Sequence, residues 1–223
     1  VGAMDLSALY RELAALAARC GAQKLVLFGS RARGDQRPGS DIDLAVYGMP
    51  KNQQGRFWWA VEELPTLLKW DIVHVTPGLA PSFRDEIERD GVVLMDRMLQ
   101  KREDLKNALA RLDESLTAYD ETPTSVVRDG AIQRFEFCTE LAWKAARAYL
   151  LDQGHTELNS PKSVLRQAYA DGLVSDQAGW LKLLEDRNLT SHMYDDEVAA
   201  AVFERIRTAH RPLFHALYAR LCD

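Results

Sequence analysis

Two short stretches decide the fold of the first half of the chain: LVLFGSRARGD, residues 25–35, and SDIDLAV, residues 40–46. Each contains a short run of large or β-branched apolar side chains, and Gly29 ends the first run. Short apolar runs next to turn residues are typical of buried strands. The sequence therefore predicts two strands, with a glycine-serine turn at the end of one and an Asp-x-Asp pair at the start of the other.

Around these strands the spacing of apolar residues changes repeatedly as far as Arg97. The pattern predicts helices over 6–17, 54–68 and 81–89, and further strands over 72–75 and 92–94. Alternation of this kind indicates mixed α and β structure in one domain. We therefore expect an α+β domain over residues 4–97, in which helices flank a mixed sheet.

The second half of the chain has apolar residues at helical spacing throughout. The pattern predicts helices over 98–119, 122–154, 160–172, 176–188 and 198–217, with a kink in the last one at Pro212. Such an arrangement is typical of an all-α bundle of four or five helices over residues 98–223. No Gly/Ser-rich stretch separates the two halves, which predicts a stiff helical junction between them.

Composition excludes several classes of protein. The 223 residues carry 28 Lys and Arg against 33 Asp and Glu, a formal net charge of -5, which argues against broad nucleic-acid binding driven by net charge. The three cysteines are far apart, which argues against a disulfide framework or a structural zinc site. No apolar run approaches the ~18 residues of a membrane span. We expect a soluble cytoplasmic protein without a membrane partner.

The turn and the acidic residues next to it suggest a site for phosphate groups. Gly29 lets backbone N–H groups approach an anion, and Ser30 adds a hydroxyl donor. Asp41 and Asp43 are two apart on a strand, so both carboxylates leave the same face and favour a divalent cation. Asp71 begins the next strand and would complete a site for one or two Mg²⁺ ions. Each signal alone also fits an ordinary turn or strand end, but together they predict phosphoryl or nucleotidyl transfer.

The order of these features resembles the minimal nucleotidyltransferase (MNT) family of the DNA polymerase β-like superfamily, over nearly all of the first half. The resemblance implies transfer of a nucleoside monophosphate from an NTP, with ATP as the expected donor and Mg²⁺ as the cofactor. By position, it assigns nucleotide binding to Gly29, Ser30, Arg31 and Arg33. It assigns metal binding and catalysis to Asp41, Asp43 and Asp71, with Asp71 assisting deprotonation of the acceptor.

A second group of candidate residues lies in the helical half, in EDRNLTSHMYDDE, residues 185–197. His192 can take and return a proton near neutral pH, and Arg187 can stabilise a charged phosphorane, which suffices for metal-free RNA cleavage by the 2′-hydroxyl. On one unbroken helix the two side chains would lie about 140° apart. Either the helix ends near Asn188, where poor helix formers begin, or two chains build one site.

The R-x4-H-x-Y pattern on a helical bundle resembles the HEPN superfamily, specifically its nucleotidyltransferase substrate-binding type, from about residue 98 to 223. Phe135, Trp143 and Lys144 also fit that pattern. The resemblance implies a metal-independent endoribonuclease that uses Arg187 and His192 on RNA, with tRNA as one target class. It further implies that Tyr194 accepts AMP. Added bulk and negative charge beside a phosphate site would oppose RNA binding.

The combined hypothesis is a single-chain toxin–antitoxin protein, in which the MNT domain transfers AMP from ATP to Tyr194 of the HEPN domain. Because a stiff junction would restrict the approach of Tyr194 to Asp71 of the same chain, we expect transfer between the chains of a homodimer. Two alternatives remain. The helical domain could present the hydroxyl of a small molecule to the MNT site, or the chain could be a non-catalytic dimeric module that binds RNA or protein.

Overall fold

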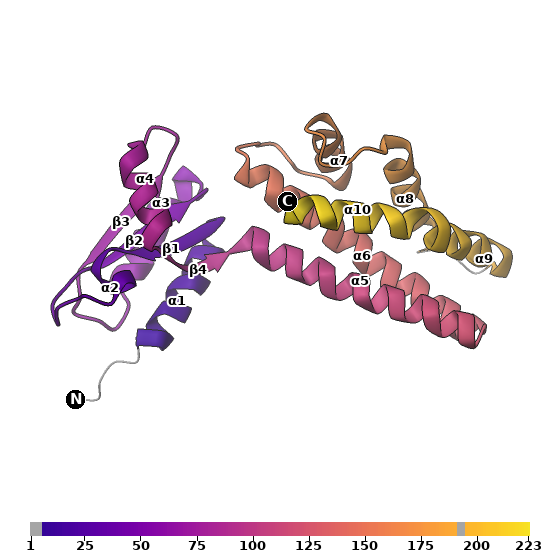
Figure 1. Ribbon diagram of the computed structural model, residues 1–223, viewed down its shortest axis with the longest axis horizontal. Coiled ribbons are helices and arrows are strands. Elements are labelled where there is room, and N and C mark those ends of the chain that lie inside the picture. The colour runs from indigo at the N-terminus through magenta and orange to yellow at the C-terminus, as the bar shows by residue number, and fades with distance from the viewer. Residues whose placement is uncertain (1–5, 191–194) are drawn as a thin grey trace. The chain divides into compact units, whose positions relative to one another are not determined.

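The computed structural model describes residues 6–190 and 195–223, and the chain divides into two compact units between Arg97 and Met98 (Figure 1). The first unit contains α1 (Leu6–Arg19), β1 (Lys24–Phe28), α2 (Gly29–Arg33), β2 (Ile42–Tyr47), α3 (Lys51–Glu62), β3 (Trp70–Val75), α4 (Pro81–Asp90) and β4 (Val92–Asp96). The second contains α5 (Arg97–Glu121), α6 (Ser125–Asp152), α7 (Pro161–Ala170), α8 (Gln177–Thr190), α9 (Asp196–Arg205), the π-helical turn η1 (Ile206–His210) and α10 (Arg211–Cys222).

The four strands form one mixed sheet in the order β3-β2-β1-β4. Strand β1 is antiparallel to both of its neighbours, whereas β2 and β3 run parallel. This confirms the α+β class expected for the first half of the chain. In such a sheet the amino-terminal ends of β2 and β3 meet at one edge, beside the carboxyl-terminal end of β1.

The two faces of the sheet are buried against different helices, because successive strand residues point to opposite sides. Leu25 and Leu27 belong to a core formed with α1 and α3. Phe28 and Ala45 belong to a second core, to which α4 contributes Ile87. Alternation along β2 places Asp43 on the same face as Ala45. The Asp-x-Asp strand therefore presents this carboxylate to the side of the sheet that α4 covers.

One predicted helix of this unit is shorter than expected. The apolar spacing predicts a helix over 54–68, but α3 ends at Glu62. Pro65 explains the difference, since proline has no N–H to donate and its ring clashes with the preceding turn of a helix. The Leu64 amide closes the end of the helix by donating to the Val61 carbonyl at 3.1 Å.

Helix α6 forms the centre of the second unit and packs against α7, α8, α9 and α10. Phe135, Cys138 and Ala142 from its apolar stripe are fully buried in the shared core. The Thr124 hydroxyl caps its first turn by accepting from the Val127 amide at 3.3 Å, and Ser160 forms a capping box at the start of α7. The expected all-α bundle is confirmed for the described residues 98–190 and 195–223.

The last predicted helix is interrupted. The sequence predicts one helix over 198–217 with a kink at Pro212, whereas the structure has α9, the π-helical turn η1 and then α10. Pro212 cannot donate a backbone hydrogen bond, so the turn before it has to adjust its pairing. The adjustment occurs over the five residues that end at His210, and it carries that side chain into the core.

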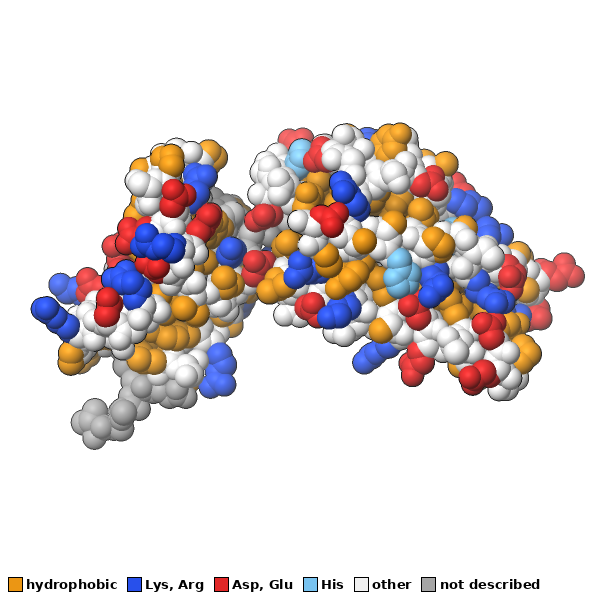
Figure 2. Space-filling view, in the orientation of Figure 1, with side chains coloured by type: hydrophobic (Ala, Val, Ile, Leu, Met, Phe, Trp, Pro, Cys, Tyr) orange, Lys and Arg blue, Asp and Glu red, His pale blue; other side chains and the backbone are white. Residues whose placement is uncertain are grey.

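Acidic and basic side chains are intermingled over the face of each unit that Figure 2 shows. This distribution agrees with a formal net charge of only -5 spread over 61 charged side chains of both signs, 28 basic and 33 acidic. Among the described helices, none combines the length and the hydropathy that crossing a bilayer requires.

Candidate functional site

The turn at Gly29 brings the end of β1 against the acidic strand β2. Gly29 has a φ of +68°, in the left-handed region that favours glycine. A Cβ atom at this position would lie 2.2 Å from Oδ2 of Asp43, so a side chain would collide with the carboxylate. The Asp43 carboxylate consequently packs directly against the backbone that leads into Ser30. Only glycine satisfies both the backbone conformation and this close approach.

Asp43 and Asp71 lie opposite each other on the parallel strands β2 and β3. Burial contributes most to raising the pKa of Asp43 above its ordinary value, and the charges of Asp71 and Asp41 raise it further. Arg31 and Arg33 act in the opposite direction. The structure thus brings the three predicted carboxylates close enough to repel one another, with Asp43 as the most shielded of them.

The position of Asp41 differs from the expectation that it shares a strand with Asp43. Strand β2 begins at Ile42, so Asp41 lies in the preceding loop, where it is exposed. Over residues 6–190 and 195–223, no three His, Cys, Asp or Glu side chains form an arrangement ready to hold a metal ion. The donor chemistry nevertheless suits a divalent cation, because a shielded carboxylate with acidic neighbours gains most from a hard positive charge.

The two arginines after Ser30 make protein contacts. The Arg31 guanidinium donates to the Ser40 carbonyl at 2.7 and 3.1 Å and to the Asp41 carbonyl at 3.1 Å. Arg31 therefore holds the loop that carries Asp41 beside α2. Arg33 pairs with Asp35 at 3.2 Å on the surface. Contact of either side chain with a nucleotide phosphate stays a prediction.

In the helical unit, Arg187 lies near the end of α8 and extends toward α6. Its Nη2 atom is 3.8 Å from Oε1 of Glu140, which is an ion pair but too long for a hydrogen bond. The Nε atom is shielded from solvent and has no hydrogen-bond partner among the described residues. The guanidinium thus has Glu140 as an ion-pair partner, while its Nε–H donor has no acceptor among the described residues.

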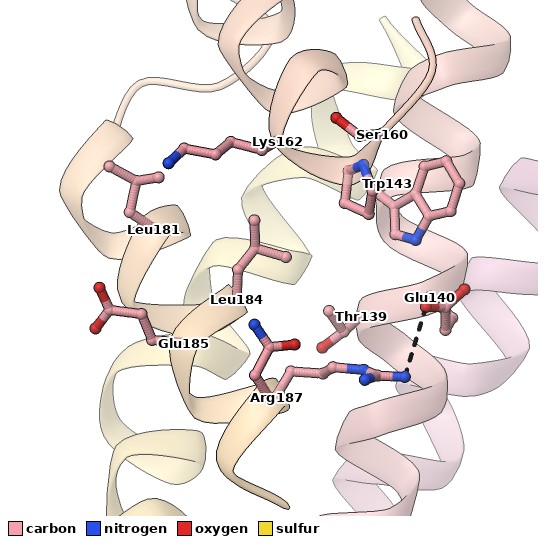
Figure 3. Close-up of a pocket in the computed structure, with 11 residues that line it drawn as sticks. Thr139, Glu140, Trp143, Ser160, Lys162, Leu181, Leu184, Glu185 and Arg187 are labelled. Carbon is pink, nitrogen blue, oxygen red and sulfur yellow. Dashed lines mark ion pairs between the residues drawn. The ribbon is translucent and has the colours of Figure 1, made fainter. Parts of the chain in front are cut away.

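Arg187 lines a cavity of about 420 Å³ between α6, α7 and α8, which we call the α6–α8 pocket (Figure 3). Figure 3 shows Leu181 and Leu184 of α8 on one side and Trp143 of α6 on the other, with the Arg187 side chain extending across toward Glu140. The pocket is lined by Thr139, Glu140, Trp143, Ser160, Pro161, Lys162, Leu181, Leu184, Glu185, Arg187 and Asn188. No sequence pattern indicates this pocket, because its walls come from three separate helices.

His192 and Tyr194 lie outside the described residues, so the structure does not report their positions. The flanking residues are described. Helix α8 continues to Thr190, two residues beyond the predicted end at Asn188. Asp195 has an extended backbone, and its carboxylate caps α9 by accepting from the Glu197 amide at 2.8 Å. An unbroken helix from Arg187 into α9 is therefore excluded.

Asp186, the neighbour of Arg187, is completely buried and anchors α8 to the C-terminal helices. Arg205 donates to both of its carboxylate oxygens at 2.7 and 2.9 Å, and Nε2 of His210 lies 2.7 Å from Oδ2. Burial alone would raise the pKa of Asp186, but the hydrogen bonds from Arg205 and His210 bring the pKa below its ordinary value. No local sequence pattern indicates this network, because Arg205 and His210 are 19 and 24 residues from Asp186.

We expect the helical unit to lose stability as the pH falls below about 6.5, the ordinary pKa of histidine. Burial holds the pKa of His210 below that value, with Arg205 and Lys182 acting in the same direction and Asp186 opposing. The unfolded chain therefore takes up a proton in a range where the folded chain does not, so stability falls with falling pH. Urea midpoints at about pH 7.5 and about pH 5.5 test this expectation.

The matched variant is His210→Gln, whose amide can still donate to Asp186 but does not titrate. We expect the pH dependence of the urea midpoint to be smaller in His210→Gln than in the parent protein. An equal pH dependence in both proteins would show that His210 is not the group responsible.

Comparison with known proteins agrees with the division of the chain into a sheet-containing unit and a helical unit. Residues 100–223, more than half of the chain, match the family described as nucleotidyltransferase substrate binding protein like, and residues 14–100 match the family described as polymerase beta, nucleotidyltransferase. A Haemophilus influenzae protein described as "Probable ribonuclease HepT" is 38% identical over 90 residues. That match covers 37% of this chain and 62% of the relative, so this chain spans less than two thirds of the relative's length.

Two solved structures are also similar. A Thermus thermophilus protein has 40% identity and a TM-score of 0.49, and the match covers 53% of this chain and 99% of that one. A Haemophilus influenzae protein described as a substrate binding domain of a nucleotidyltransferase has 27% identity and a TM-score of 0.49, covering 55% and 99%. Because one family model covers more than half of the chain, the chain belongs to the nucleotidyltransferase substrate binding protein like family, and the second model shows a polymerase-β-type nucleotidyltransferase domain ahead of the helical domain.

Proposed function

We propose that the first unit transfers AMP from ATP to Tyr194 with Mg²⁺, and that the helical unit is a ribonuclease which this modification silences. The observation that carries the transferase half is the position of Asp43, which packs against the Gly29 turn and lies opposite Asp71. A backbone turn that opens a helix beside paired carboxylates suits a triphosphate and a divalent cation. The chain would then be a toxin–antitoxin system in one polypeptide.

The chemistry assigns a role to each of these groups. The phenol oxygen of Tyr194 attacks the α-phosphorus of ATP, a new P–O bond forms, and the bond to pyrophosphate breaks. The phenolic proton passes to a carboxylate, for which Asp71 is the candidate, or to water. Asp43 and Asp71 would hold the cation, which neutralises charge on the triphosphate when it is bound. Gly29 and Ser30 would contact the phosphates through backbone and hydroxyl donors.

The ribonuclease half rests on Arg187 and on the relative described as a probable ribonuclease. Arg187 lines the α6–α8 pocket and its Nε donor has no partner among the described residues, and guanidinium groups bind phosphate through such N–H donors. The 2′-hydroxyl of the RNA would attack the adjacent phosphorus while His192 takes its proton. A 2′,3′-cyclic phosphate would form, and the 5′-oxygen would leave as a hydroxyl with a proton from His192 or water. AMP on Tyr194, two residues from His192, would add negative charge where the RNA phosphate has to bind.

The intact mass of the full chain, before and after incubation with ATP and Mg²⁺, tests the transferase half. We expect the parent protein to gain AMP units, and we expect Asp43→Asn and Tyr194→Phe to gain none. Asp85→Asn is the matched control, because it removes an exposed carboxylate of α4 that lines no described site. It should gain AMP as the parent does.

The same samples distinguish the other hypotheses. No mass gain in a protein shown to start unmodified would contradict self-modification and direct the search to an external hydroxyl acceptor. RNA incubated in EDTA with the unmodified parent should be cleaved, and cleavage should fall after AMP is attached. Cleavage that is equal before and after AMP attachment would contradict the regulatory part of the proposal.

A further inference from the structure

We infer that the α6–α8 pocket holds one nucleotide of a single-stranded RNA, with the base against Trp143 and a phosphate at Arg187. The inference rests on the proposed ribonuclease function, because it names the part of the substrate that the pocket would take. It adds residues of α6, α7 and α8 to a site for which the sequence indicated only Arg187, His192 and Tyr194. Trp143, Glu140 and Leu184 would then act in substrate binding.

The size and the walls of the pocket fit a nucleobase. Its volume of about 420 Å³ falls within the range of about 300–1,000 Å³ that is usual for ligand pockets. Trp143 on α6 faces Leu181 and Leu184 on α8 across the space (Figure 3). Proteins that bind single-stranded RNA hold flat, unstacked bases against aromatic side chains in this way. The ammonium of Lys144 lies 5.6 Å from the indole centroid, but Lys144 is not among the residues that line the pocket, so it does not occupy the space for the base.

Two donors at the pocket lack acceptors. Nε1 of Trp143 and Nε of Arg187 are both shielded from solvent and have no hydrogen-bond partner among the described residues. Indole and guanidinium groups donate hydrogen bonds and do not accept them. An unpaired shielded donor is unfavourable, so a ligand with acceptor atoms gains a hydrogen bond from either group once that side chain turns toward the pocket. A nucleotide has acceptors on its base and on its phosphate.

Glu140 distinguishes a nucleotide from a simple anion. Its Oε1 atom is 3.8 Å from Nη2 of Arg187, outside hydrogen-bond distance, and its Oε2 atom pairs with Lys144 at 3.2 Å. The Glu140 carboxylate would repel inorganic phosphate, but it can accept from the exocyclic amino group of adenine or cytosine. The pocket thus presents a donor for phosphate and an acceptor for a base, as one nucleotide requires.

Binding of an uncleavable RNA tests the inference without relying on catalysis. The probe is a fluorescein-labelled 2′-O-methyl oligoribonucleotide of adenosine and cytidine, which lacks the attacking 2′-hydroxyl. Anisotropy is measured with the full chain in EDTA, so that divalent cations are absent. We expect Trp143→Leu to weaken binding by about tenfold or more, because stacking of one base on an aromatic side chain is lost. Trp143→Phe should recover most of the affinity.

A pair of charge substitutions on α8 supplies the matched control. Leu184→Glu places a carboxylate inside the pocket and should weaken binding by about tenfold or more. Leu189→Glu adds the same charge to α8 at an exposed position that does not line the pocket, so it should weaken binding less. Circular dichroism confirms that each variant is folded. Equal affinities in the parent, Trp143→Leu and Leu184→Glu proteins would overturn the inference, as would no binding by the parent.

Two further arms separate this inference from the proposals on which it rests. AMP, CMP and the unlabelled oligomer are each added as competitors. If either mononucleotide displaces the probe at a concentration as low as the oligomer requires, the assignment to RNA is overturned. Cleavage of unmodified RNA is measured in parallel. Cleavage by a parent whose binding is insensitive to Trp143→Leu would support the ribonuclease and overturn the pocket. Binding that Trp143→Leu weakens, by a parent that cleaves no RNA, would support the pocket and contradict the ribonuclease.

Discussion

Replacing Gly29 with alanine is expected to reduce the proposed nucleotidyl transfer by about 100-fold or more, because a displacement of reacting groups by about 1 Å has an effect of that size. The new Cβ would lie 2.2 Å from Oδ2 of Asp43, so the turn, the carboxylate or both must move. The rate of AMP gain by intact mass measures the loss. Binding of ATP should weaken in the same variant, since the backbone donors of the turn move as well.

Gly34→Ala provides the control for this substitution. Gly34 has a φ of +78°, close to the +68° of Gly29, so alanine introduces similar backbone strain of about 1 kcal/mol at both positions. A Cβ at Gly34 would meet no atom within 4 Å. We therefore expect Gly34→Ala to retain most of the transfer activity. Equal losses in the two variants would show that strain, and not the position of Asp43, causes the effect.

Replacing Asp186 with alanine is expected to destabilise the helical unit by about 3 kcal/mol. Removing one partner of a buried ion pair commonly costs about 3–5 kcal/mol. We take the lower end because the Arg205 side chain is 35% exposed and can turn toward water. His210 cannot, since it is 1% exposed and stacks on Phe135 with 5.4 Å between the ring centroids. Urea unfolding and hydrogen exchange of α8 measure the loss.

The adjacent residue supplies the control for Asp186→Ala. Glu185 has the same charge and lies on the same helix, but it is exposed, and among the described residues its ion-pair partner is Lys182 at 3.3 Å. Surface pairs of this kind contribute about 0–1 kcal/mol. Glu185→Ala should therefore change the urea midpoint little. A loss in Glu185→Ala as large as in Asp186→Ala would contradict the assignment of the stability to the buried network.

Much of the architecture could be predicted from periodicity alone. Strand β1 follows from a four-residue apolar run that Gly29 ends, and α6 follows from an apolar stripe through Phe135 and Cys138. The ends of elements were less predictable. Pro65 stops α3 earlier than its apolar residues suggest, and the last helix divides around a π-helical turn ahead of Pro212. Apolar spacing locates the middle of a helix, whereas its ends depend on capping and packing.

By itself, the sequence indicated the strands of the first unit and the acidic residues at their ends, because short apolar runs next to turn residues mark strands and a strand alternates its side chains between two faces. Tertiary structure alone decided that Asp41 lies ahead of β2, that Asp186 binds Arg205 and His210, and that Trp143 faces Leu184 across a pocket. These contacts join residues of different helices. Their spacing along the chain carries no local period, so only the packing of α6, α7, α8 and the C-terminal helices brings them together.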